Sequence, residues 1–126
     1  MFPRFVDEEG NRDLMKEVTE EELKVVMGIF QKDKSPGPDG WTIDFFLDLF
    51  DILGQDLLQV IEESRSSGWI PASFNSTFIA LIPKSDNANS LNDFRPISLC
   101  NCVYKIISKV IALRIKAILS EQISAE

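Results

Sequence analysis

Apolar side chains recur at helical spacing after Thr19, in the segment from Glu20 to Phe30. Thr19 and Glu22 have the spacing of a capping box, in which each side chain accepts a hydrogen bond from the backbone N–H of the other residue. The three acidic residues of the first turn also suit the positive end of a helix dipole. The pattern therefore predicts a helix over residues 20–30, with an apolar face formed by Leu23, Val26, Met27 and Phe30.

Two further helices are predicted in the next part of the chain. The segment from Trp41 to Leu53 is apolar on most faces, so we expect a helix that is buried on most sides, with Thr42 as its N-cap. Gly54 is expected to break this helix. A second helix then runs from Gln55 to Ser67 and ends at Gly68.

Two segments rich in β-forming residues follow. Thr77 to Ile82 is a short apolar run that Pro83 ends, and Phe94 to Leu99 comes after a polar connector. We expect the two runs to pair as an antiparallel hairpin with a long loop, with Pro96 at an edge or at the start of the strand. Pro71 to Phe74, before the first run, predicts a single turn.

The longest predicted helix runs from Asn101 to Leu119. At about 100° per residue, Lys105, Lys109 and Lys116 fall within a narrow arc opposite the apolar side. Arg114 lies in the middle of that apolar side, where an unpaired charge is costly. Either it meets a carboxylate or its stem carries the charge to the surface. We predict a carboxylate from the acidic first half of the chain.

These elements predict an α+β fold, mostly helical, with about four substantial helices and one antiparallel β-hairpin. A length of 126 residues suggests one domain, and 44% hydrophobic residues is an ordinary share for a globular chain. No apolar run is long enough to cross a membrane, and the acidic N-terminus does not resemble a signal peptide. We therefore expect an intracellular protein of the nucleus or cytoplasm, with no membrane partner.

The charge distribution limits the functions that the chain can have. The net charge of −7 excludes a protein that simply coats nucleic acid. Residues 1–67 hold 7 basic and 16 acidic groups, whereas residues 68–126 hold 6 basic and 4 acidic groups. An anion site should therefore lie in the second half.

Several kinds of catalytic site are also excluded. Histidine is absent, which removes Ser-His and Cys-His nucleophiles. Cys100 and Cys102 cannot complete a four-coordinate zinc site, so we interpret them as small buried thiols. No pair of carboxylates has the setting for two-metal phosphoryl transfer. We predict no catalytic residue, no metal ligand and no cofactor bound by this chain.

Two cations stand near the loop end of the predicted hairpin. Lys84 follows the first strand, and Arg95 lies at the start of the second. A compact ammonium and a planar guanidinium together suit a triphosphate or a nucleic-acid backbone. On spacing alone, both can equally be ordinary solvated loop residues. Lys105, Lys109 and Lys116 of the last helix likewise allow two interpretations. They form either an ordinary solvent-exposed face or a contact to a phosphate backbone.

The loop Pro36, Gly37, Pro38, Asp39 and Gly40 forbids regular structure, because prolines fix φ and glycines tolerate positive φ. We expect a stiff, shaped loop. Its aspartate can be read as a metal ligand, but an Asx-turn or a cap for the next helix suits a lone aspartate better.

Five blocks of sequence, taken in order, resemble the amino-terminal part of plant-type non-LTR, LINE-type retrotransposon reverse transcriptases. The resemblance extends over nearly the whole chain from about Thr19. The blocks are Ser35–Gly40, Phe45-Phe46, Phe78–Lys84, Asp93–Asn101 and Tyr104–Lys109.

The resemblance implies that the strand pair belongs to the fingers of an RNA-directed DNA polymerase. It implies that Lys84 and Arg95 contact the triphosphate of the incoming nucleotide, and that residues 36–40 lie near the template. The partners implied are an RNA template, a DNA primer and deoxynucleotides.

The chain departs from this family where catalysis would begin. The family's palm supplies an aspartate and a Tyr-x-Asp-Asp turn that hold Mg²⁺, and neither is present here. We expect residues 1–126 to be a single partial domain, truncated before the palm that would pack on it, and inactive alone. The alternative is a non-catalytic helical interaction module derived from a decayed element, with the aromatic helix Ile43 to Leu53 as its binding surface.

Overall fold

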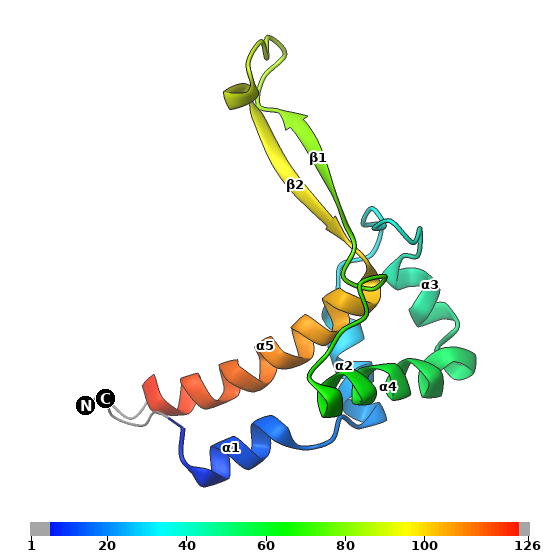
Figure 1. Cartoon of the computed structure of the whole chain (residues 1–126), viewed down its shortest axis with the longest axis vertical. Helices are drawn as coiled ribbons and strands as arrows, with labels where there is room; N and C mark the ends of the chain where they lie inside the picture. The colour runs from blue at the N-terminus through cyan, green and yellow to red at the C-terminus, as the bar shows by residue number, and fades with distance from the viewer. Residues whose placement is uncertain (1–5, 124–126) are drawn as a thin grey trace.

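Five helices and one β-hairpin make up residues 6–123, the part of the chain that the computed structural model describes. The helices form the body of the molecule, and the hairpin projects away from it (Figure 1). The predicted α+β class is confirmed. In order, the elements are α1 (Glu8–Met15), α2 (Glu20–Ile29), α3 (Ile43–Asp48), α4 (Phe50–Ser67), β1 (Thr77–Pro83), a short 3-10 turn (Leu91–Asp93), β2 (Phe94–Cys100) and α5 (Cys102–Ile123).

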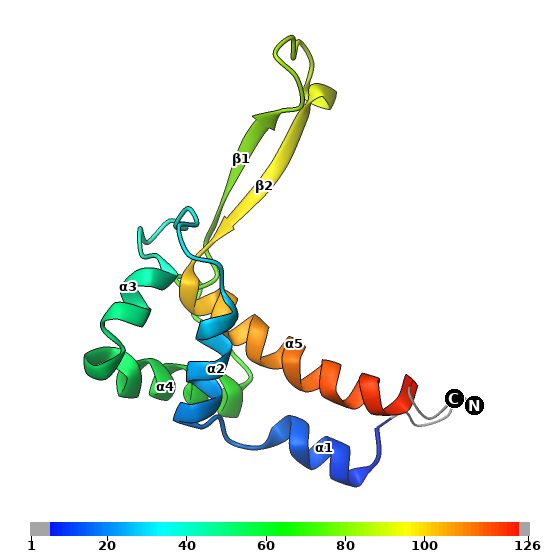
Figure 2. The same ribbon diagram turned by 180° about the vertical axis from the view of Figure 1, so that it is seen from behind.

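The core lies where α2, α4 and the first half of α5 meet (Figure 2). Fully burying one such aliphatic side chain contributes about 1.5–3 kcal/mol, so this junction holds the helices together. The apolar face predicted for the first helix is the face that α2 buries. The most deeply buried apolar side chains are Leu23, Val26, Met27, Ile61 and Ile106.

The helix ends follow the predicted caps. The Thr19 hydroxyl accepts a hydrogen bond from the Glu22 amide at 3.1 Å, which fixes the start of α2. Gly68 ends α4 with a φ of 69°, a left-handed conformation that glycine adopts without strain. The Glu22 carboxylate binds chiefly to a guanidinium on α5, and the backbone N–H of Thr19 makes a lesser contact with it.

The boundary predicted at Gly54 is wrong. The helix is interrupted at Leu49 instead, which separates the short α3 from α4. Gly54 lies inside α4. A Cβ at Gly54 would lie 2.8 Å from Cε1 of Phe50, so the glycine makes room for that ring. The segment from Trp41 to Leu53 was expected to be buried on most sides, and this is also wrong. Ile43 is buried, whereas Ile52 is 73% exposed.

Helix α1 was not predicted, because Leu14 and Met15 are its only large apolar residues. None of its residues is fully buried. Its N-cap is Asp7, whose Oδ1 accepts a hydrogen bond from the Gly10 amide at 2.7 Å. The helix lies alongside the C-terminal half of α5, as Figures 1 and 2 show. None of the helices within residues 6–123 is long and apolar enough to cross a membrane.

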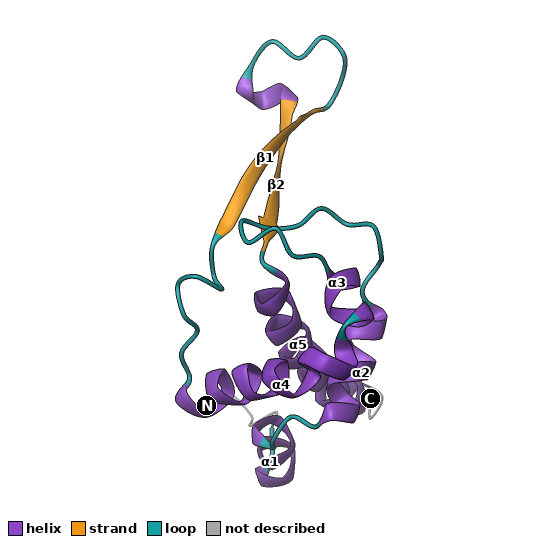
Figure 3. Cartoon of the chain, turned by 90° about the vertical axis from the view of Figure 1, so that its right-hand side faces the viewer, coloured by secondary structure: helices purple, strands orange, loops and turns teal. Residues whose placement is uncertain are grey.

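The antiparallel hairpin is confirmed. Thr77 pairs with Cys100 at its base, and Ile82 pairs with Arg95 near its tip. Between the strands and the helical body, the loop that joins α2 to α3 reaches the base of the hairpin (Figure 3). The strands bury little, and their most exposed large apolar side chains are Phe78, Ile79, Leu81 and Ile82.

Candidate functional site

Asn101, at the junction of β2 and α5, holds residues 36–40, which we call the proline-glycine loop. Its side chain is 1% exposed, and Oδ1 accepts a hydrogen bond from the Asp39 amide at 3.0 Å. Its Nδ2 donates to the carbonyl oxygen of Ser73 at 2.8 Å. Gly37 packs so closely that a Cβ there would lie 2.5 Å from the carbonyl carbon of Cys100. The loop is therefore fixed against the base of the hairpin.

The same loop carries two further local contacts. Asp39 Oδ1 accepts from the Trp41 amide at 3.0 Å, which is the Asx-turn expected for this aspartate. Burial raises the pKa of the Cys102 thiol, so it stays protonated and donates to the Trp41 carbonyl at 3.3 Å. The Trp41 ring stacks on Phe45 with centroids 4.2 Å apart and stays 48% exposed, so it offers an aromatic face beside the loop.

Lys84 and Arg95 lie at the tip end of the hairpin, and both are exposed. The Lys84 amide donates to the Asp93 carbonyl at 2.7 Å, which continues the ladder one bond beyond the strands. Since Ile82 pairs with Arg95 and strand side chains alternate, Lys84 and Arg95 project from the same face. The register thus puts the two cations that the sequence singled out on one face near the tip of the hairpin.

The surroundings of this pair leave its positive charge available. Within residues 6–123, neither cation forms a salt bridge. The Asp93 carboxylate accepts instead from the amides of Asn89 and Ser90, which lowers its pKa. The Lys84 ammonium donates to the Asn92 carbonyl at 2.6 Å and retains two further donors for an anion.

A second basic site lies where α2, the segment that follows it and α5 meet. Lys34, Lys105 and Lys109 line a cavity of about 250 Å³ together with apolar side chains and Ser35. Among the described residues, its lining includes no carboxylate. Lys116, the third member of the predicted arc, lies outside this cavity, farther along α5. Sequence reasoning missed Lys34, because only the fold brings it to the lysines of α5.

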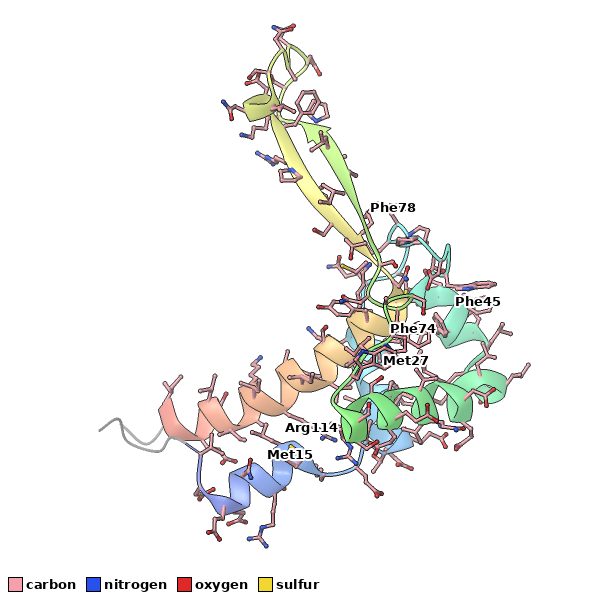
Figure 4. All side chains as sticks on the ribbon, viewed as in Figure 1. Met15, Met27, Phe45, Phe74, Phe78 and Arg114 are labelled. Carbon is pink, nitrogen blue, oxygen red and sulfur yellow. The ribbon has the colours of Figure 1, made fainter. Side chains whose placement is uncertain are left out.

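Arg114 does what the sequence predicted. Its Nε and Nη2 donate to the two carboxylate oxygens of Glu22 at 2.8 and 2.7 Å, and its side chain is 9% exposed. Its Nη1 donates to the carbonyls of Leu14 and Lys16, so it also holds the segment that follows α1 (Figure 4). The Arg114 hydrogen bond holds the pKa of Glu22 below its ordinary value. Arg114 is therefore a structural residue and not an anion ligand.

The residues in this part of the chain do not fit a metal site. Across residues 6–123, no three cysteine, aspartate or glutamate side chains lie close enough together to hold a metal ion. The Asx-turn at Asp39 uses that carboxylate within the loop itself.

No protein-family model matches the chain. The chain is related to a protein encoded by a transposon. That relative is the Transposon TX1 uncharacterized 149 kDa protein of Xenopus laevis, with 36% identity over 118 residues. The alignment covers 94% of this chain and 9% of the Xenopus protein, so the chain spans about a tenth of its relative's length.

Proposed function

We propose that this chain is a fingers segment of the RNA-directed DNA polymerase, or reverse transcriptase, of a non-LTR retrotransposon. In this proposal it positions the incoming nucleotide and the template. The observation that carries the proposal is the placement of Lys84 and Arg95 on one face at the tip of a projecting hairpin. The relationship to a transposon protein and the five sequence blocks support it.

Lys84 and Arg95 have complementary roles toward a triphosphate. The Lys84 ammonium supplies a compact charge, whereas the Arg95 guanidinium binds two oxygens at once through its planar fork. Charge-assisted hydrogen bonds of this kind contribute about 1.5–3 kcal/mol each. Both side chains are exposed, so a nucleotide reaches them without any rearrangement of the helical core.

The template side of the proposal rests on the lysine cavity and the loop above it. Lys34, Lys105 and Lys109 offer positive charge to a phosphate backbone. Residues 36–40 directly follow Ser35, which lines the same cavity, and Asn101 holds them through the Asp39 amide. Lys116 extends this charge along α5. RNA template, DNA primer and deoxynucleotides are the partners that this arrangement implies.

The proposed segment positions substrates and does not perform the chemistry. Polymerisation of nucleotides needs carboxylates that hold two metal ions, and Mg²⁺ serves this purpose in such polymerases. The 126 residues contain no Tyr-x-Asp-Asp sequence. Metal-binding carboxylates must therefore come from another part of the polymerase, whose palm would cover apolar side chains of the hairpin.

Nucleotide titration tests the proposal directly. With dTTP at low salt, we expect backbone amide shifts around Lys84 and Arg95 and a dissociation constant in the millimolar range, about −4 kcal/mol. Arg95→Ala should weaken binding, whereas Arg12→Ala, which removes the same charge from exposed α1, should not. Shifts that leave the hairpin tip untouched, or equal effects of both variants, would contradict the triphosphate role.

A second candidate function is a non-catalytic interaction module derived from a decayed element. The exposed apolar side chains of Trp41 and Ile52, on either side of α3, favour it. In that case a partner protein would bind at the α3–α4 corner, and Ile52→Ser would abolish its binding. Sequencing the genomic DNA beyond the Glu126 codon discriminates the two candidate functions. The polymerase proposal requires sequences that encode the aspartate and the Tyr-x-Asp-Asp turn there, in any reading frame.

A further inference from the structure

A groove of about 830 Å³ separates α1 and α2 from the C-terminal half of α5. Its lining includes apolar side chains that the fold leaves uncovered or partly covered. Val25 is 65% exposed on α2, Ala117 is exposed on α5, and Leu113 and Ile118 are half-buried beside it. The apolar strip is bounded by α1, in which no residue is fully buried.

Carboxylates dominate the rest of the lining. Among residues 6–123, the cations of the lining are Lys16 and Arg114, and neither neutralises the groove. Arg114 is committed to Glu22, and Lys16 lies 3.9 Å from the Asp13 carboxylate with both side chains mostly exposed. The exposed acidic residues of the groove, apart from the N-cap Asp7, are Glu9, Asp13, Glu17, Glu21 and Glu121.

We propose that this groove binds a basic amphipathic helix from a protein partner. An apolar strip between acidic walls complements a helix that carries leucine-like side chains on one face and lysine or arginine on its flanks. Because the walls repel phosphate, nucleic acid is the wrong chemistry for this face. A second copy of this chain, with its own charge of −7, is also poorly matched.

The location separates this surface from the basic sites of the molecule. The groove lies beside α1, at the end of α5 away from the hairpin (Figure 1). Lys34, Lys105 and Lys109 lie near the start of α5, close to the proline-glycine loop. A partner helix in the groove therefore leaves the nucleotide and template surfaces accessible. The inference does not depend on the proposed polymerase function.

A designed peptide tests the inference. The probe is a helix of roughly 14 residues, about 21 Å long. It has leucine at positions i, i+3, i+4 and i+7, and lysine elsewhere. We expect its titration into the labelled chain to shift amides of α1, α2 and the C-terminal half of α5. A peptide with glutamate in place of every lysine should cause no shift there.

Matched variants distinguish the groove from the general negative charge of the chain. Glu17→Lys with Glu21→Lys should weaken peptide binding at least tenfold. Asp48→Lys with Asp56→Lys makes the same charge change on α3 and α4 and should weaken binding less than twofold. All four positions are exposed, so circular dichroism should show unchanged helix content.

Four results would overturn the inference. They are shifts centred outside the groove, equal weakening by both double variants, binding of the glutamate peptide, and a short RNA that shifts the same groove amides. Val25→Ser provides an independent check, since it removes apolar surface without changing charge. It should also lower the affinity for the lysine peptide. An unchanged affinity would show that the peptide does not contact the apolar strip.

Discussion

Arg114 and Glu22, separated by 92 positions in the chain, form a two-point ion pair with donor–acceptor distances of 2.8 and 2.7 Å. The same guanidinium donates to three backbone carbonyls, that of Leu14 in the last turn of α1 and those of Lys16 and Glu17 between α1 and α2. One side chain of α5 therefore fixes the path of the chain into α2 and the position of α1 beside it.

Arg114→Ala should destabilise the chain by about 2–4 kcal/mol. Removing one partner of a fully buried pair costs about 3–5 kcal/mol, and Glu22 is 25% exposed, which lowers the cost. Arg114→Lys should restore little, because one ammonium cannot bind both the carboxylate and three carbonyls. Urea unfolding measures the free energy of unfolding of both variants. A decrease of under about 0.5 kcal/mol for Arg114→Ala would contradict this role.

The Arg114–Glu22 pair should make stability depend on pH in the acidic range. The pKa of Glu22 is lowered in the folded chain from an ordinary value of 4.5. Its contribution is therefore complete above the unfolded pKa and is lost as the pH falls through the folded pKa. Unfolding between pH 6 and pH 3 should show a falling urea midpoint, with a shallower fall for Glu22→Gln. The pair Glu62 and Arg65, which lowers the pKa of Glu62 in the same way, remains in that variant.

Two glycine substitutions should have opposite effects. Gly37→Ala places a Cβ within 2.7 Å of the backbone and side chain of Asn101, so the loop must shift and stability should fall. Gly28→Ala lies in α2 with nothing within 4 Å of the new Cβ, and should stabilise the helix by about 0.5–1 kcal/mol. Thermal unfolding compares the two, and equal effects would show that the loop does not pack closely on Asn101.

The lysine cavity should give RNA binding a steep dependence on salt. For single strands, each phosphate contact contributes about 0.7 to the slope of log affinity against log salt. Lys34→Gln with Lys109→Gln should therefore flatten the slope by about 1.4 if both bind phosphate. Fluorescence anisotropy with a short single-stranded RNA measures this. An unchanged slope would show that the lysines of this cavity do not contact the phosphates of the template.

The isolated chain should extend no primer on an RNA template, with either magnesium or manganese. The physical reason is that transition-state charge is left uncompensated without metal-binding carboxylates. A primer-extension assay with radiolabelled deoxynucleotides is the measurement. Template-dependent extension above the level of a Lys84→Ala, Arg95→Ala double variant would show that the assignment of roles is wrong.

Local signals that agree with one another were sufficient to predict much of the fold. α2 followed from a cap, an acidic first turn and one apolar face, and the hairpin followed from two β-rich runs around a polar connector. Arg114 was placed by helical phase alone, because a charge among apolar neighbours demands a partner. Lys84 and Arg95 were singled out by their positions at the strand ends.

What escaped prediction depends on contacts between distant segments. Gly54 resembles a helix stop, but the ring of Phe50 needs the space that it leaves. Asn101 resembles an ordinary polar residue at a helix start, yet it bonds to two loops at once. α1 has only two large apolar residues, and Arg114 of the distant α5 binds carbonyls at its end and just after it.

The uncovered hairpin also determines how the isolated chain behaves at high concentration. Both β1 and β2 are edge strands, and unpaired strand edges with exposed apolar side chains bind to one another between chains. Pro83 and Pro96 interrupt the two edges, because neither residue has an N–H to donate. Self-association should therefore begin in the middle of the ribbon, around Phe78 to Leu81, and a single lysine at Ile79 should suppress it.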